Sequence, residues 1–346
     1  MADFSSALYL GMHHATRQLA PWRQLSLGKP AALAEPPGAR ELASELAGLQ
    51  GCAAASLLPS TLHLFFDLFR MLARVRCTVL VDGGAYPLAR WGAVCAAALA
   101  PERMQVRQFA AGSLAGARRA ARHCREMGRM PVILADGYTP GAARPPPLTA
   151  YAALAQATEG CLVLDDTQAL GVLGRHGGGS PRLHRLQGMP VLVGASLAKG
   201  FGVPLAVLAG PAQAIERFEA GSATRLHCSP PTLAQINAGR RALLLNRSCG
   251  DGLRALLRQR CRQFRSALAL AGLRCEGGEF PVQRVLLPAG CDGFRLHEAL
   301  RRGGVQCLLQ DAGRRMALMF LLRADHTVQD VALATMAVVS YMKELA

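Results

Sequence analysis

Acidic and aromatic residues are both scarce in this chain of 346 residues. Its 23 aspartates and glutamates stand against 39 lysines and arginines, a formal net charge of +16, and Phe, Trp and Tyr make up only 5% of the residues. A nucleic-acid-binding surface interleaves basic with aromatic residues or carries a recognisable module, and the sequence shows neither. We therefore expect no nucleic-acid partner. We interpret the arginines as solvated helix faces; attraction of an acidic partner or an anionic substrate is the alternative.

Long hydrophobic runs and metal-binding cysteine patterns are also missing. No uninterrupted apolar run reaches the roughly 18 residues that a membrane-spanning helix needs, and the first residues lack the basic and apolar stretches of a secretory signal. The 11 cysteines show no CxxC or His-rich spacing, which argues against a zinc site and for reduced thiols. We expect a cytoplasmic protein with no membrane segment and no metal.

The remaining composition is that of a globular protein, with 51% hydrophobic and 18% charged residues. The length exceeds that of a usual single domain, so two lobes are expected. Short apolar runs at 77–81, 131–135, 161–164 and 191–193 alternate with stretches of helical spacing, among them 39–49 and 62–72. This alternation predicts an α/β fold, in which a mainly parallel sheet is covered by helices.

Composition also suggests where the parts of the chain begin and end. Residues 1–40 are interpreted as an N-terminal arm, 41–248 as the large domain and 249–346 as a smaller C-terminal α+β domain. The C-terminal part should open with a long Arg/Leu helix and continue with strands near 282–287 and 316–322. Three consecutive prolines make 140–147 a loop.

Two short blocks carry the chemistry. Residues 162–166, L-V-L-D-D, have the pattern of a buried strand that ends in a carboxylate, Asp165. Residues 196–202, S-L-A-K-G-F-G, place Lys199 in a glycine-rich turn after a strand. Burial lowers the pKa of a lysine and frees its amine to form a Schiff base. An aspartate beside it could keep a pyridine nitrogen protonated, as pyridoxal 5'-phosphate (PLP) requires to act as an electron sink.

These blocks resemble those of a known family. Residues 163–174, V-L-D-D-T-Q-A-L-G-V-L-G, with G-G-G-S at 177–180, are similar to the V-D-D-A-H-G-x-G-V-x-G and G-R-G-S motifs of the α-oxoamine synthases. Residues 196–206, S-L-A-K-G-F-G-V-P-L-A, resemble that family's T-F-G-K-G-F-G-V-S-G-A segment, and 4–14, F-S-S-A-L-Y-L-G-M-H-H, resemble its F-S-S-N-D-Y-L-G-L-S-H-H opening. The resemblance implies a fold-type I PLP-dependent transferase with a sheet of the seven-stranded type.

The resemblance also assigns roles around the cofactor ring. Lys199 is expected to form the Schiff base and Asp165 to face the pyridine nitrogen. Gln168 stands where the family has a histidine, and it can donate a hydrogen bond but cannot titrate near neutral pH. Tyr86 takes the place of a ring-stacking histidine, a role that a phenol can fill. Asp136 falls in the family's T-E-G block, at a strand end near the cofactor.

Phosphate contacts follow from the same resemblance. Ser60, Thr61 and Leu62 should open a helix whose N-terminal N–H groups bind the phosphate. Ser196 matches the family's phosphate-binding threonine, and Ser229 matches a hydroxyl that the partner subunit lends. The resemblance therefore implies a homodimer.

The pattern breaks where the family binds the carboxylate of its amino acid. Ala7 replaces an asparagine of the opening block, and alignment of 324–330 with the family's A-A-H-E-M-Q-D places Ala317 at an arginine of the R-L-R-L-T-L strand. Arg314 and Arg315 lie a few residues earlier and are candidates to replace it. Loss of this clamp would favour an amine whose carboxylate is absent or masked as an ester, amide or carrier-bound thioester.

Three functions fit these residues. The first is acyl transfer of the α-oxoamine synthase type, which joins an amine substrate to an acyl group from a CoA or acyl-carrier-protein thioester. The second is an aminotransferase that acts on a ketone, an aldehyde or a carrier-bound substrate. The third is a non-catalytic protein that retains the fold, which the presence of both Asp165 and Lys199 disfavours.

Overall fold

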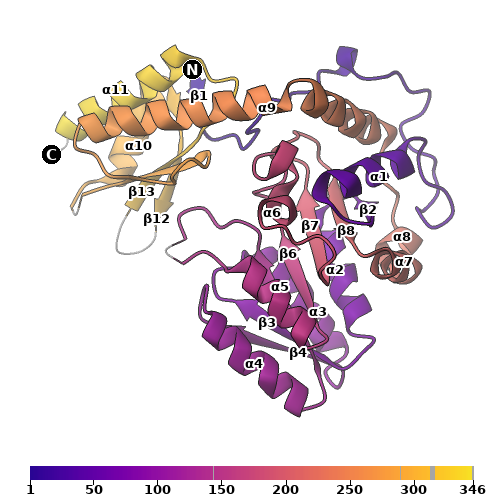
Figure 1. Cartoon of the computed structure of the whole chain (residues 1–346). Helices are drawn as coiled ribbons and strands as arrows, with labels where there is room; N and C mark the ends of the chain where they lie inside the picture. Colours follow the sequence, from indigo (N-terminus) through magenta and orange to yellow (C-terminus); the bar gives the residue numbers. More distant parts are fainter. Residues whose placement is uncertain (143, 289, 312–315, 345–346) are drawn as a thin grey trace. The chain divides into compact units, whose positions relative to one another are not determined.

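The computed structural model describes residues 1–142, 144–288, 290–311 and 316–344. It consists of two compact units, a larger one, His14–Ser248, and a smaller one made of Met1–His13 and Cys249–Ala346 (Figure 1). The first residues, expected within an arm, thus belong to the smaller unit. There β1 (Ala2–Asp3) pairs in parallel with β11 (Val305–Gln306), which attaches the N-terminal segment to that unit.

The larger unit is built on a seven-stranded sheet with the order β2-β8-β7-β6-β5-β3-β4. All neighbouring pairs from β7 to β4 are parallel, and β8 runs antiparallel to both β7 and β2. This confirms the expected mainly parallel sheet. The strands are β2 (Ala54–Leu58), β3 (Cys77–Asp82), β4 (Met104–Phe109), β5 (Met130–Asp136), β6 (Cys161–Asp165), β7 (Val191–Ser196) and β8 (Ala206–Gly210).

Helices cover both faces of this sheet, so its central strands are apolar throughout. Because successive side chains of a strand point to opposite faces, Val79 and Val81 of β3 pack in one core and Leu80 in the other. The first core lies under α2 (Thr61–Leu72), α3 (Pro87–Leu99) and α7 (Ala212–Gly221), and the second under α4 (Leu114–Glu126) and α5 (Leu148–Ala157).

Local signals mark the helix ends that the sequence predicted. α1 (Ala39–Gln50) stops at Gly51, whose φ of 77° suits the left-handed conformation of a helix C-terminus. Ser60 caps α2, and its side-chain oxygen accepts the backbone N–H of His63. The helices expected at 39–49 and 62–72 are thereby confirmed.

The smaller unit holds a four-stranded sheet with the order β12-β13-β10-β9, and all of its pairs are antiparallel. β10 (Val282–Leu286) and β13 (Met316–Leu321) are the two strands predicted there, and they pair with each other. The unit also contains β9 (Cys275–Glu276), β12 (Leu308–Asp311), α10 (Gly293–Arg302) and α11 (Val328–Glu344).

The long helix begins earlier than predicted. α9 spans Leu233–Leu270, whereas the change in composition suggested a start near residue 249. The cause is that the segment before residue 249 also has a buried apolar face, which includes Ile236 and Leu243, seven residues apart. None of the helices in the described ranges combines the length and apolar character that crossing a bilayer demands.

Candidate active site

Three neighbouring parallel strands of the larger unit end in aspartate. β3 ends at Asp82, β5 at Asp136 and β6 at Asp165, and the Cα atoms of Asp136 and Asp165 are direct partners across their strands. β7, the next strand along the sheet, ends at Ser196, and Lys199 follows in a turn. The carboxyl ends of parallel strands are where open α/β sheets bind ligands. This edge is the candidate site.

Asp165 is 7% exposed and lies beside Lys199. Burial raises the pKa of its carboxyl, while hydrogen bonds from the side chain and backbone of Thr167, together with the charge of Lys199, oppose that rise. The backbone N–H of Thr167 donates to Asp165 Oδ1 at 3.1 Å. Asp165 is therefore a buried carboxylate whose ionised form depends on these few groups.

Lys199 is half-buried in the turn after β7. Burial lowers the pKa of its amine, and the negative charges of Asp165 and Asp136 act in the opposite direction. A lysine whose pKa is lowered holds more of its amine neutral and nucleophilic at physiological pH. The side chain therefore has the properties of a Schiff-base lysine.

Glycines bring the loops after β6 and β7 into contact. A Cβ atom on Gly200 would lie 2.4 Å from the backbone oxygen of Leu170, and one on Gly171, where φ is +86°, would lie 3.1 Å from Gly200 Cα. Only glycine fits this backbone-to-backbone approach. The contact places Gln168, half-buried in the loop after β6, and Lys199 on two loops that touch.

Asp136 orients the start of α3. Burial raises the pKa of its carboxyl to about 7; hydrogen bonds from Tyr86 and Thr139 oppose the rise, and the charges of Asp165 and Asp82 add to it. Its Oδ1 accepts the backbone N–H of Tyr86 at 2.9 Å. Tyr86 is 64% exposed, so this bond fixes the backbone at the base of an exposed aromatic ring.

The expected phosphate residues gather at the same edge. Both β2 and β7 pair antiparallel with β8, so β2 and β7 run in the same direction, and Ser60 follows the end of β2 as the N-cap of α2. Thr61 and Leu62 are the first residues of that helix, where backbone N–H groups lack intrahelical acceptors. Ser196 Oγ accepts the N–H of Ala198 at 3.2 Å within the turn that leads to Lys199.

Ser229 is not brought to this edge by any described contact. It is exposed after α8 (Ala223–His227), and in the described ranges no hydrogen bond joins it to the strand ends. Its expected role involves a neighbouring subunit and stays a prediction.

The alanines expected at the positions of the resembled family's carboxylate clamp lie in the smaller unit. Ala7 is half-buried in the N-terminal segment, and Ala317 is 1% exposed in β13, between Leu286 of β10 and Gln310 of β12. Arg314 and Arg315, the candidate substitutes, lie outside the described residues.

Three residues of the site escaped the sequence analysis. Thr167 bonds Asp165, and its Oγ1 accepts the backbone N–H of Ser196 at 3.1 Å. Asp82 accepts the hydroxyl of Tyr151 at 2.7 Å, and Asp166 accepts the N–H of Ser180 at 3.0 Å. The sequence could have indicated these residues only by their position directly at or after the end of an apolar run.

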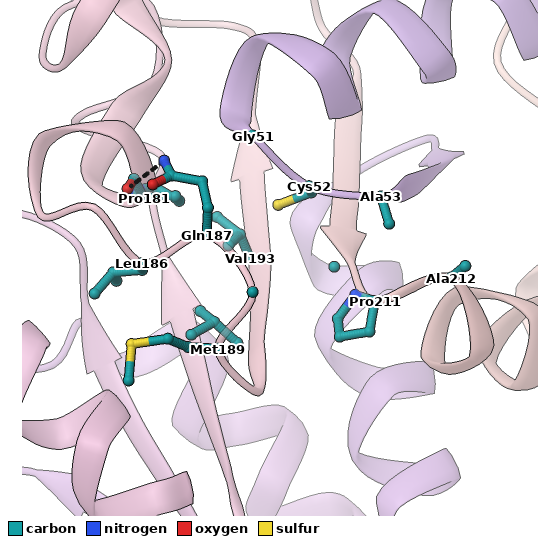
Figure 2. Close-up of a pocket in the computed structure, with 13 residues that line it drawn as sticks. Gly51, Cys52, Ala53, Pro181, Leu186, Gln187, Met189, Val193, Pro211 and Ala212 are labelled. Carbon is teal, nitrogen blue, oxygen red and sulfur yellow. Dashed lines mark hydrogen bonds between the residues drawn. The ribbon is translucent and has the colours of Figure 1, made fainter.

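A separate cavity lies at the opposite edge of the sheet. It has a volume of about 250 Å³ and is lined by residues before β2 and β7 and after β8, among them Cys52, Met189 and Pro211 (Figure 2). Burial raises the pKa of the Cys52 thiol to about 11, which keeps it protonated and unreactive. Within the described ranges, His, Cys, Asp and Glu form no group of three or more that could hold a metal ion.

Comparisons with known proteins agree with the resemblance seen in the motifs. No family model matches the chain. The 8-amino-7-oxononanoate synthase of Thioalkalivibrio sulfidiphilus is 30% identical over 171 residues, 49% of this chain and 43% of that protein. The enzyme of the same name from Alkalilimnicola ehrlichii is 31% identical over 187 residues, 54% of this chain and 47% of its own length. The aligned region thus spans about half the length of these relatives.

Solved structures show the same fold over nearly the whole chain. Serine palmitoyltransferase from Sphingomonas wittichii has a TM-score of 0.87 at 14% identity, covering 99% of this chain and 88% of its own. The 8-amino-7-oxononanoate synthase of Francisella tularensis has a TM-score of 0.77 at 17% identity, covering 99% and 98%. The chain has the fold of fold-type I PLP-dependent transferases and resembles the α-oxoamine synthases in sequence.

Proposed function

We propose that this protein is a PLP-dependent transferase of the α-oxoamine synthase type, which transfers an acyl group from a thioester to the carbon next to the nitrogen of an amine substrate. One observation carries the proposal: at the carboxyl edge of the sheet, the Lys199 amine, its pKa lowered by burial, interacts with the buried carboxylate of Asp165. The relatives named above, and a solved structure of SPT with PLP as an internal aldimine, support the cofactor and the reaction class.

The described residues fit this cofactor. Lys199 offers an amine to the aldehyde and Asp165 a carboxylate to the pyridinium nitrogen. The capped start of α2, with Ser60 and Thr61, offers N–H groups and hydroxyls to the phosphate. When bound, PLP supplies an electron sink for negative charge on the carbon beside the amine.

The chain's own groups would move protons and hold charge. Lys199 accepts a proton from that carbon when its amine is neutral, a state that burial favours. Asp165 would offer its negative charge to the pyridinium nitrogen, and Gln168 would supply a hydrogen bond without titrating. In the net reaction a carbon–carbon bond forms, the thioester carbon–sulfur bond breaks and the sulfur leaves as a thiol. The carbon loses a proton, or CO₂ where its carboxylate is free.

Reduction with borohydride tests the cofactor link. The chain contains three lysines, Lys29, Lys199 and Lys343, so peptide mass spectrometry locates a reduced adduct without ambiguity. We expect the adduct on Lys199 and a visible absorption band that Lys199→Ala abolishes. Lys29→Arg, at an exposed turn, is the matched control and should retain both. A reducible adduct that persists in Lys199→Ala would refute the assignment.

Release of thiol from acyl-CoA or an acyl-carrier-protein thioester tests the reaction. It should require both the thioester and an amine and should fall about a hundredfold or more in Asp165→Asn, since removal of a preorganised electrostatic group has effects of this size. Conversion of an amine to a carbonyl compound and pyridoxamine phosphate, without any thioester, would instead establish an aminotransferase.

We also propose a homodimer in which Ser229 serves the neighbouring subunit's phosphate site. The support is the match of the Ser229 segment to the α-oxoamine synthase pattern and its exposed position. Sedimentation at micromolar concentration should show a dimer. Ser229→Ala should weaken PLP binding without dissociating the dimer. A monomer with full PLP occupancy would contradict this.

A further inference from the structure

Thr167 connects the two strand ends on which the proposed function depends. It lies two residues after Asp165, in the turn that follows β6. Its backbone N–H donates to Asp165 Oδ1 at 3.1 Å, and its Oγ1 accepts the backbone N–H of Ser196, the last residue of β7, at 3.1 Å. One residue therefore ties the carboxylate on β6 to the strand that leads to Lys199.

The hydroxyl of Thr167 can both accept and donate a hydrogen bond. A hydroxyl has one donor and two lone pairs, so an oxygen that accepts the Ser196 N–H still has its own hydrogen to donate. Burial raises the pKa of the Asp165 carboxyl, and hydrogen bonding from the side chain and backbone of Thr167 opposes that rise. The motif that the sequence resembles has alanine at this position, whose side chain cannot accept the Ser196 N–H.

We infer that Thr167 is a positioning residue: its hydroxyl, bonded to the Ser196 N–H, fixes the Asp165 carboxylate relative to the turn of Lys199. This inference rests on the proposed function for its purpose, although the hydrogen bonds stand without it. The charge of Lys199 also acts on Asp165, and Asp165 in turn interacts with Asp136 and Asp166. Because a substitution at Thr167 retains all three, it isolates the contribution of the hydroxyl.

Affinity for PLP gives the first test. A neutral hydrogen bond such as that between the Ser196 N–H and Thr167 Oγ1 contributes about 0.5–1.5 kcal/mol, so Thr167→Ala should raise the Kd for PLP about two- to tenfold. Thr167→Ser retains the hydroxyl and should bind as the wild type does. Thr139→Ala is the matched control, because Thr139 Oγ1 donates to the neighbouring carboxylate, Asp136 Oδ2, at 3.4 Å. Equal loss in Thr167→Ala and Thr167→Ser would show that the methyl group matters, not the hydroxyl.

Titration of the Asp165 carboxyl gives a second test that needs no cofactor. In PLP-free protein with carbon-13 in the aspartate carboxyl groups, the Asp165 signal is identified by its loss in Asp165→Asn. The pH midpoint of that signal should move upward in Thr167→Ala and stay in place in Thr167→Ser. If the wild type binds no PLP, the proposed function fails and this titration alone decides the inference. If Asp165 titrates at the same pH in all three proteins, the inference is overturned even where PLP binds.

Discussion

The two units of the molecule surround their aspartates with opposite chemistry. In the larger unit, Asp136 and Asp165 are buried beside each other at neighbouring strand ends, and the pKa of each carboxyl is raised by burial. In the smaller unit, burial also acts to raise the pKa of Asp325, but hydrogen bonds from His13 at 3.0 Å and Arg323 at 2.9 Å outweigh it, and the pKa is lowered.

This difference distinguishes the candidate site of the larger unit from an ion pair that stabilises the smaller unit. Carboxylates whose ionised form is disfavoured make the folded state less stable at neutral pH, and such groups cluster where chemistry needs them. A carboxylate paired with arginine contributes stability instead. The larger unit therefore keeps unfavourable electrostatics at the strand ends of the candidate site, whereas the smaller unit pairs its aspartate with cationic groups.

The largest effect is expected from Asp136→Asn. The carboxyl pKa rises from 3.8 to about 7 on folding, so between about pH 4 and 7 the folded state binds more protons than the unfolded state. The free energy of unfolding then falls as the pH rises through this window, by up to about 4 kcal/mol. Asparagine does not titrate, so the variant should gain stability over the wild type with rising pH and keep the gain above about pH 7.

Urea unfolding of PLP-free protein at pH 4.5, 6 and 8 measures this. If the stability difference between Asp136→Asn and the wild type stays constant across the three pH values, ionisation of the buried Asp136 carboxyl does not destabilise the folded state as expected. The contrast with the smaller unit would then fail.

Much of the larger unit could be read from its sequence, because its strands are buried on both faces. The apolar runs at 77–81 and 161–164 became β3 and β6 almost to the residue. β2, β4 and β8 were not predicted. In β4 the exposed positions, among them Gln105 and Arg107, break the apolar run at the edge of the sheet.

The site was predictable only where a motif was present. Lys199 and Asp165 follow apolar runs and match a family pattern, so each could be named in advance. The role of Thr167 depends on a bond to Ser196, 29 residues away, and arises only when β6 and β7 pair. Likewise, the bond between Asp136 and Tyr86 joins residues 50 apart. No local pattern encodes such contacts.

A smaller effect is expected on the binding of amino-acid substrates, and it tests the smaller unit's part of the comparison. The motif alignment puts Ala7 and Ala317 at the clamp positions of the resembled family, so we expect free glycine, alanine and serine to bind at least tenfold more weakly than their methyl esters or simple amines. A charge-assisted hydrogen bond contributes about 1.5–3 kcal/mol, and each 1.4 kcal/mol is a tenfold change in affinity. Titration of the visible spectrum of the PLP-bound protein measures both series. Tight, saturable binding of the free acids would show that another group holds the carboxylate.

The smallest effect is expected from Asp325→Asn, and its sign is opposite to that of Asp136→Asn. Because the pKa of Asp325 is lowered in the folded state, its contribution is present above the pKa of the unfolded chain, 3.8, and is lost as the pH falls through the folded value. The side chain is 35% exposed, so solvent screening limits the ion pair with Arg323 to about 0.5–1 kcal/mol. The variant should therefore be less stable than the wild type at pH 7, and the difference should shrink as the pH falls below 3.8. Urea unfolding in low salt and in 1 M salt checks the cause, since screening should shrink the difference at pH 7. If Asp325→Asn instead gains stability with rising pH, as Asp136→Asn is expected to do, the two units do not differ in the way described.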